Sequence, residues 1–312
     1  MAPKNTASRT AGFALVTGAS SGSGRATARA LGALGWRLRI VGRTPKKLDA
    51  AVDELRRGGA EVESFRADFS SLEQVRNLAS EVLARDEPLN VLINNAGVWH
   101  PEFRLSSDGH EDTFAVNHLA PFLLTHLLLP RLRETPGDRR IVHVSSRLHR
   151  QAGTTQTRLG RAVHIANVMG IPARGPAARF EFDAIDQQAG YRGLEAYARS
   201  KLAQVIISGE FARREQASGV TSNAVHPGSV YTDVARDNRV LSWLNPLAKP
   251  FLKSPEQGAR TSVHVATARE LVGVSGKYFA NERPAAEAGI VTDADVARRL
   301  WTLSEQLTSP DR

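Results

Sequence analysis

Short apolar runs alternate with amphipathic stretches along most of the chain. The runs FALV, RLRIV, EVESF, NVLIN and RIVHVS predict buried strands, because they are short, rich in branched residues and bounded by turn residues. They cover residues 13–16, 37–41, 61–65, 90–94 and 140–145. The runs GVTSNAV and GKYFA predict two further strands at residues 219–225 and 276–280.

Helical patterns separate these strands. RATARALGALG follows the first run, and Gly35 suits the position just after the end of that helix. Other helices are expected to start near Pro45, Ser71, Ser107 and Pro255. Alternation of this kind implies a doubly wound α/β domain of the Rossmann type, with helices on both faces of a mostly parallel sheet of about seven strands. We predict a single domain over residues 1–312.

A glycine-rich stretch, TGASSGSG, lies between the first strand and the first helix. Gly18, Gly22 and Gly24 permit positive φ and a close approach of a ligand to the backbone. The N–H groups that open the next helix attract an anion, so this turn favours a dinucleotide pyrophosphate. A tight structural turn is the alternative, and the strand-turn-helix context argues against it.

The second strand ends in IVGRTPKKLD, where sites that select NAD carry an acid for the ribose 2′-hydroxyl. Here Arg43 takes that place, and no acid occurs between Trp36 and Leu48. A guanidinium favours a 2′-phosphate by charge and by forked hydrogen bonding. We therefore predict NADP as the cofactor, with a solvent-facing arginine as the alternative.

Tyr197 and Lys201 are four residues apart in GLEAYARSKLAQ, so they share a helix face. A phenol that transfers a proton near pH 7 needs its pKa lowered by about three units, worth roughly 4 kcal/mol. A nearby lysine charge in a partly dry site supplies energy of that order. The alternative for each residue alone is amphipathic packing or a solvated charge.

TGASSGSG, NNAG, VSS and YARSK occur in this order, and with them the chain resembles the short-chain dehydrogenase/reductase family of classical type. The stretches GHEDTFAVNHLAPFLLT, AYARSKLAQ and NAVHPGSVYTD are most similar to its retinol-dehydrogenase-like and carbonyl-reductase-like branch. The resemblance covers roughly residues 13–280. It implies hydride transfer between NADP(H) and a carbonyl or secondary alcohol.

The resemblance also implies four catalytic residues. Tyr197 would exchange a proton with the substrate oxygen, and Lys201 would hold the nicotinamide ribose and lower the pKa of the phenol. Ser146 would donate a hydrogen bond to the carbonyl, with Ser145 as the alternative if the register differs by one. Asn117 would complete a proton relay to the lysine. Taken singly, Asn117 could be an ordinary helix residue and the serine pair a helix cap.

Cofactor contacts follow from the same resemblance. Asp68 would bind the adenine amine and Phe69 would contribute its backbone. Asn95 would lie near the adenine ribose, although it could equally steady the sheet. The expected contacts are Gly18, Ser20, Ser21, Gly22, Gly24, Arg43, Asp68, Phe69, Asn95, Ala96, Gly97, Tyr197, Lys201, Pro227, Gly228, Val230 and Thr232.

Four features depart from, or add to, the family pattern. Ser23 replaces an apolar residue and is expected to loosen packing under the turn. An insertion at residues 147–194 is expected near the active site, with a plain surface excursion as the alternative. The apolar stretch at residues 230–253 is expected to form a lid over a lipophilic substrate, unless it packs on its own core. Residues 281–312 would form a C-terminal extension.

Other functions remain as alternatives. The same scaffold could reduce a carbon-carbon double bond, and product analysis would separate the two reactions. A non-catalytic protein that binds NADP(H) as a sensor would lack a catalytic residue, and none is missing. Both a monomer and a homo-oligomer stay open, because relatives of both kinds are expected.

Composition limits the remaining classes. With 41% hydrophobic and 23% charged residues the chain has the usage of a folded protein. It has no cysteine, and its nine histidines lack metal-ligand spacing, so we expect no metal site. The net charge of +9 is spread along the chain, which argues against a nucleic-acid partner. We see no leader and no uninterrupted apolar span, and we expect a cytoplasmic protein.

Overall fold

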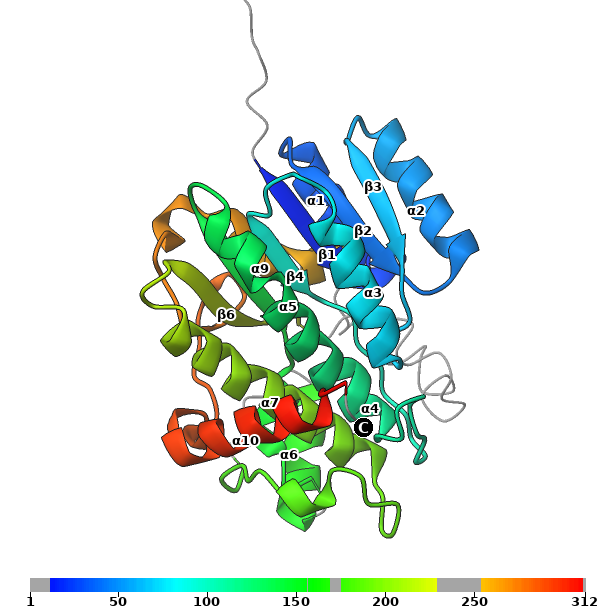
Figure 1. Ribbon diagram of the computed structural model, residues 1–312. Coiled ribbons are helices and arrows are strands. Elements are labelled where there is room, and N and C mark those ends of the chain that lie inside the picture. The colour runs from blue at the N-terminus through cyan, green and yellow to red at the C-terminus, as the bar shows by residue number, and fades with distance from the viewer. Residues whose placement is uncertain (1–11, 156, 169–174, 229–253, 311–312) are drawn as a thin grey trace, which may run out of the picture.

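One eight-stranded sheet runs through the centre of the computed structural model, which describes residues 12–155, 157–168, 175–228 and 254–310 (Figure 1). The spatial order of the strands is β3-β2-β1-β4-β5-β6-β7-β8. Neighbours pair in parallel except for β7 and β8. The strands are β1 Phe13–Thr17, β2 Arg37–Gly42, β3 Val62–Arg66, β4 Val91–Asn94, β5 Arg139–Val144, β6 Val220–His226, β7 Tyr278–Ala280 and β8 Arg283–Pro284.

The predicted doubly wound fold and its seven strands are confirmed, and one short strand is added. Asn281 and Glu282 have φ of 52° and 62°, and they turn the chain from β7 back into β8. Positive φ at both central residues is the geometry of a tight two-residue hairpin. Because β8 has only two residues, no apolar pattern could indicate it.

The order of the strands reverses between β1 and β4. From β1 the chain moves outward to β2 and β3, and it then returns to β4 on the other side of β1. A crevice forms beyond the carboxyl ends of the strands at such a reversal, and ligands of open α/β sheets bind there. Thr17 ends β1 and Asn94 ends β4, so the glycine turn and the NNAG stretch both begin at this crevice.

Helices cover both faces of the sheet (Figure 1). Leu15 on β1 belongs to the core cluster that includes residues of α3, α5, α7 and α10, whereas Ala14 and Val16 belong to the cluster with α1, α2 and α9. This alternation follows from the two-residue period of a strand. The α-helices are α1 Gly22–Ala33, α2 Pro45–Arg57, α3 Leu72–Leu83, α4 Asp112–Phe114, α5 Ala120–Glu134, α6 Arg158–Val168, α7 Gly193–Arg214, α9 Pro255–Thr267 and α10 Ala294–Leu307.

Shorter helical turns complete the described chain. A π-helical turn, η1, joins α4 to α5, and a 3₁₀ turn, η2, follows β5. Both turns carry predicted site residues or lie directly beside them. The turns are η1 Ala115–Leu119, η2 Arg147–Gln151, η3 Phe182–Ala184, η6 Arg269–Leu271 and η7 Gly289–Thr292.

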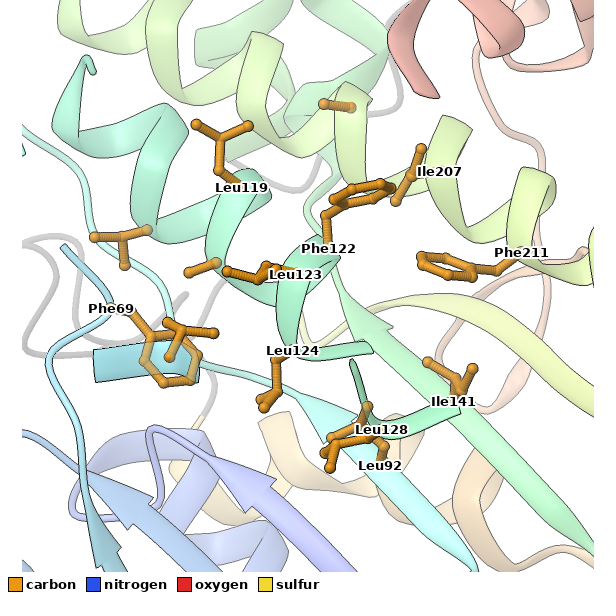
Figure 2. Close-up of a cluster of buried hydrophobic side chains, with 14 of the residues drawn as sticks. Phe69, Leu92, Leu119, Phe122, Leu123, Leu124, Leu128, Ile141, Ile207 and Phe211 are labelled. Carbon is orange, nitrogen blue, oxygen red and sulfur yellow. The ribbon is translucent and has the colours of Figure 1, made fainter. Parts of the chain in front are cut away.

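The stretch Asp112–Glu134, which joins α4, η1 and α5, is the helix of the described chain that is long and apolar enough to cross a membrane. In this fold 83% of its apolar window is buried. Figure 2 shows Leu128 of α5 beside Leu92 of β4, and Phe122 of α5 beside Ile207 of α7. The apolar character of the stretch is therefore that of a helix in the core.

The helix expected near Ser107 begins later, at Asp112. Gly109 has φ of 78°, and the Ser107 Oγ donates to the Ser70 carbonyl oxygen at 2.8 Å, so this stretch forms a turn fixed to a neighbouring loop. The Glu111 carboxylate accepts from the N–H groups of the first turn of α4 and sets its start. The predicted helix start near Ser107 is therefore wrong, because the residue that caps the helix, Glu111, lies four residues later.

The insertion and the C-terminal residues join the main core. Phe180 and Ile185 of the insertion belong to the large cluster. Trp301 of α10 meets Phe122 and Phe211 edge-on, with ring centres 5.1 and 4.9 Å apart. Residues 281–310 therefore close one face of the domain rather than extend away from it.

Three fully buried histidines make the stability of the fold dependent on acid. Burial lowers the pKa of His118 and of His143 to about 3, and that of His149 to about 4. Below a pH near 6.5 the histidines of the unfolded chain become protonated, whereas these three buried rings stay neutral in the folded protein. The free energy of unfolding therefore falls as the pH falls from 6.5. His110 acts in the opposite sense, because its hydrogen bond to Asp186 raises its pKa.

We expect the free energy of unfolding to fall by roughly 3 kcal/mol between pH 6.5 and 5, as measured by urea titration. Carboxylates whose pKa lies below the usual range change the free energy of unfolding only at lower pH. The change between pH 6.5 and 5 therefore reports on the histidines. A His143→Phe variant removes one of the three and should show a shallower slope. Stability that is constant or rises towards pH 5 would contradict the prediction.

Candidate active site

The glycine turn joins β1 to α1 at the reversal of the sheet. Gly18 and Gly22 have φ of 66° and 54°, values that other residues adopt only with strain. A Cβ on Gly18 would also lie 2.8 Å from the Ala96 Cα. Ser21 precedes α1 in an extended conformation, and its side chain makes no capping hydrogen bond. The Ser21 side chain therefore leaves the first N–H groups of α1 without a capping acceptor, and these groups can donate to a pyrophosphate.

The turn is fixed to the end of β4 by polar contacts. The Ser23 Oγ donates to the Asn95 Oδ1 at 3.1 Å, and the Asn95 Nδ2 donates to the Thr17 carbonyl oxygen at 2.9 Å. A Cβ on Gly24 would overlap both the Asn95 amide nitrogen and the Gly18 carbonyl oxygen. Ser23 therefore ties the turn down, which corrects the expectation that it loosens the packing.

A groove of about 360 Å³ runs along the carboxyl edge of the sheet beside this turn. Its lining brings together most of the residues predicted to contact the cofactor. These are Gly18, Ser20, Ser21, Gly22, Arg43, Asp68, Phe69, Asn95, Ala96 and Gly97. Gly24 lies beneath the turn, and Pro227 and Gly228 follow β6 outside this lining.

Arg43 stands at the end of β2, where the groove meets solvent. Its side chain is 66% exposed, and its Nη1 lies 3.7 Å from the Asp68 Oδ2. Thr44 and Lys47 line the same end of the groove. A phosphate at this end would meet two cationic side chains and one carboxylate.

Sequence reasoning missed several residues of the groove. Val98, Trp99 and His100 continue from the NNAG stretch into its lining, and Val116 and Lys47 enter from neighbouring elements. Lys47 had a signal, since it belongs to the same TPKK stretch that directed attention to Arg43. The others had none, because only the fold of the loop after β4, and of η1 in the case of Val116, brings these residues to the groove.

Tyr197 and Lys201 lie on the first half of α7, as the four-residue spacing requires. The Lys201 Nζ is 5.5 Å from the centre of the Tyr197 ring. It donates to the Val144 carbonyl oxygen at 3.0 Å and to the Gln204 Oε1 at 2.9 Å. The ammonium is therefore held at the end of β5, directly beneath the serine pair.

Burial controls the ionisation of both groups. It raises the pKa of Tyr197 to about 12, although a hydrogen bond with the Ser146 side chain acts in the opposite direction. It also lowers the pKa of Lys201 to about 7. The phenol is thus neutral at physiological pH, the form that can donate a proton. The predicted lowering of its pKa by Lys201 is not seen in this geometry.

The two serines after β5 have different surroundings, which favour Ser146 over Ser145 as the candidate catalytic serine. Ser145 is buried, and its Oγ donates to the Lys201 carbonyl oxygen at 2.7 Å. Ser146 is half-buried, and its side chain lies close enough to Tyr197 to lower the pKa of the phenol. Ser145 therefore fixes strand to helix, and Ser146 is the hydroxyl placed beside the phenol.

Asn117 lies in the π-helical turn η1, a kind of distortion that is frequent at functional sites. Its Oδ1 accepts from the Val98 N–H at 2.8 Å, and its Nδ2 donates to the Val98 carbonyl oxygen and to the Ser200 Oγ, both at 2.9 Å. A Cβ on Gly97 would lie 3.1 Å from the Asn117 Oδ1 and 3.3 Å from the Lys201 Nζ. The end of the groove at Gly97 therefore meets the predicted catalytic residues.

Some predicted features lie outside the described residues. Val230, Thr232 and the predicted lid at residues 230–253 are among them. Within the described ranges, no three histidine or acidic side chains gather in a way that could hold a metal ion. The groove, with its glycine cradle and its cation at the outer end, fits a dinucleotide instead.

Comparisons with known proteins agree with this geometry. Residues 12–158 match the family model for short chain dehydrogenases. Mouse retinol dehydrogenase 12 is 36% identical over 295 residues, covering 94% of this chain and 85% of that protein. Human retinol dehydrogenase 11 is 36% identical over 292 residues, covering 93% and 83% of the two chains.

A solved structure adds the fold to this evidence. It is that of an NAD(P)-dependent gluconate 5-dehydrogenase, as its description has it, from Beutenbergia cavernae with bound NADP. It superposes with a TM-score of 0.65 at 26% identity and covers 86% of this chain and 94% of that one. The protein therefore belongs to the short-chain dehydrogenase/reductase family of oxidoreductases, which use a nicotinamide cofactor, and within it is retinol-dehydrogenase-like.

Proposed function

We propose that the protein transfers a hydride between NADP(H) and a carbonyl or secondary alcohol of a lipophilic substrate. One observation carries this proposal: the Tyr197 ring lies beside the buried Lys201, whose Nζ is 5.5 Å from the ring centre. The glycine-cradled groove reaches the same place, since Gly97 lies against Lys201 and Asn117. The names of the retinol dehydrogenase relatives support an apolar substrate.

The four residues have distinct parts in the proposed reduction. The bound nicotinamide supplies the hydride. Ser146 donates a hydrogen bond to the substrate oxygen and stabilises the negative charge that develops there. Tyr197 donates the proton, and it is protonated at neutral pH because burial raises its pKa to about 12.

Lys201 and Asn117 hold the proton-transfer group in place. Lys201 is buried and its pKa is lowered to about 7, so it can exchange a proton near physiological pH. Asn117 clamps the loop that carries Val98 and bonds to Ser200 beside Lys201. Together they keep the phenol, the ammonium and the groove in one arrangement.

Loss of NADPH absorbance across a panel of carbonyl compounds tests the proposed function. The panel should span retinoids, steroids, quinones, aromatic aldehydes and polyketide fragments, and the products should be identified. We expect alcohols from apolar aldehydes or ketones. Products with a reduced carbon-carbon bond would favour the alternative reaction, and no turnover with any carbonyl or alcohol would overturn the proposal.

The proposed preference for NADP rests on Arg43. An Arg43→Asp change replaces a cation by an anion at the outer end of the groove. We expect the KM for NADPH to rise about 30-fold and that for NADH to change by less than about threefold, because only NADPH carries the 2′-phosphate. Steady-state kinetics with both cofactors measure this difference.

Arg57 offers a control of equal charge, since it is an exposed arginine in the last turn of α2, away from the groove lining. An Arg57→Asp variant should leave both KM values unchanged. Equal increases for the two cofactors in the Arg43→Asp variant would remove the assignment of the 2′-phosphate to Arg43.

A further inference from the structure

His149 connects Ser146 to a distant part of the chain. It lies in η2, three residues after Ser146, and is 0% exposed. Its Nδ1 is 2.7 Å from the Ser146 carbonyl oxygen, and its Nε2 is 3.2 Å from the Ala288 nitrogen. A carbonyl accepts and a backbone N–H donates, so the ring must be neutral with its proton on Nδ1.

The surroundings keep the ring in this form. Burial lowers the pKa of His149 to about 4, so the ring is neutral at physiological pH. The ring meets Tyr278 of β7 edge-on, with ring centres 4.6 Å apart. Ala288 is 5% exposed and belongs to the large core cluster. His149 is thus fixed on one side by a strand of the sheet and on the other by the segment that leads to α10.

Ser146 depends on the turn that contains His149. The residue is extended, and it caps η2 by accepting from the Leu148 N–H through its Oγ at 3.3 Å. Its carbonyl oxygen accepts from the His149 N–H at 3.1 Å as well as from the His149 ring. The contacts of Leu148 and of the His149 backbone are local. The His149 ring instead joins Ser146 to Ala288, which lies 139 positions after His149.

Ordinary packing is the competing explanation for a buried histidine. His118 and His143 illustrate it, because each has one ring nitrogen without a hydrogen-bond partner. Their rings stack in the aromatic core against Phe122 and Phe211. The His149 ring instead has partners at both nitrogens, and one of them is the backbone of the predicted catalytic serine. That pattern belongs to a connecting hydrogen-bond network rather than to core filling.

We propose that His149 is a positioning residue, whose neutral ring holds Ser146 at the correct place beside Tyr197 by donating from Nδ1 to its carbonyl oxygen, while the Ala288 N–H helps to orient the ring. The proposal rests on the proposed function, in which the Ser146 hydroxyl bonds to the reacting oxygen. Misplacement of such a group by about 1 Å can cost on the order of 100-fold in rate. His149 itself touches neither substrate nor cofactor in this role.

Three substitutions separate the two ring nitrogens. In His149→Asn the amide N–H can take the place of Nδ1 and still donate to Ser146. In His149→Gln the amide lies near the former Nε2, and in His149→Phe neither contact remains. We expect kcat to fall about 10- to 100-fold in the Gln and Phe variants and less than about fivefold in the Asn variant, with the KM for NADPH unchanged in all three.

A Ser146→Ala background distinguishes positioning from a general structural role. There His149→Phe should reduce kcat by no more than about twofold, because the group to be positioned is gone. His143→Phe, at a buried ring stacked on Phe211, controls for the loss of a core histidine and should leave kcat unchanged. Melting temperature and NADPH affinity establish that each variant is folded.

The results distinguish a failure of the proposed role of Ser146 from a failure of the proposed role of His149. Activity that survives in Ser146→Ala alone would overturn the catalytic role of Ser146 in the proposed function. If Ser146→Ala is impaired, then a fully active His149→Phe or an Asn variant as impaired as Phe overturns the positioning role of His149. A full additional loss on the residual kcat of the Ser146→Ala background overturns it as well. Should His149→Phe fail to fold, the difference between the Asn and Gln variants decides.

Discussion

A Tyr197→Phe variant is expected to lose about 10³-fold in kcat for every carbonyl that the protein accepts, equivalent to about 4 kcal/mol of transition-state stabilisation. The change removes one oxygen and with it the proton donor beside Ser146. NADPH affinity should change by less than about twofold, because the phenol is not part of the groove lining that holds the glycine turn and Arg43. Stopped-flow turnover and fluorescence titration of NADPH measure the two quantities.

Tyr191 provides the matched control six residues earlier in the chain. Its phenol donates to the Glu111 Oε1 at 2.9 Å and to the His100 carbonyl oxygen at 3.2 Å, and it has no contact with Ser146. Tyr191→Phe should cost about 1 kcal/mol of stability and leave kcat within about threefold. Retention of reduction by Tyr197→Phe within tenfold of the parent would exclude the phenol as the proton donor.

The sheet and the cofactor groove followed from local signals in the sequence. The apolar runs placed seven strands within one or two residues, because central strands such as β1 and β4 carry continuous apolar runs, whereas the edge strand β3 alternates between buried and exposed residues. The glycine turn was predictable because a strand, a turn and a helix occur without interruption around Gly18. Arg43 could be named for the same reason, since its distance from that turn is fixed by one strand-helix-strand unit.

Local sequence signals could not predict contacts between residues that are far apart in the chain. The Ser23 hydroxyl bonds to Asn95, 72 residues away, and nothing in the local pattern distinguishes that contact from a poorly packed serine. His149 meets Ala288 across 139 positions. The ionisation of the Tyr197 and Lys201 pair also depended on burial, which the spacing of four residues does not report. Sequence reasoning named the candidate catalytic residues and missed the contacts that hold them.

Gly24 is the third glycine of the turn, and it offers the sharpest test of whether the turn binds the dinucleotide. In Gly24→Ala the new methyl group would overlap the Gly18 carbonyl oxygen and the Asn95 amide, neither of which can rotate away. Asn95 is held by Thr17 and Ser23, so the turn itself must move. We expect a loss of about 4 kcal/mol in unfolding free energy and at least about 100-fold in NADPH affinity.

Gly209→Ala is the control, because Gly209 also lies within a helix but a Cβ there would meet nothing within 4 Å. That variant should gain up to about 1 kcal/mol from helix propensity and bind NADPH as the parent does. Destabilisation of Gly24→Ala with unchanged NADPH affinity would mean that the turn supports the sheet and the pyrophosphate binds elsewhere. Loss of NADPH affinity in a Gly24→Ala variant that is still folded would place the cofactor on the turn, because a shifted backbone carries its N–H groups away from the phosphate while the sheet remains intact.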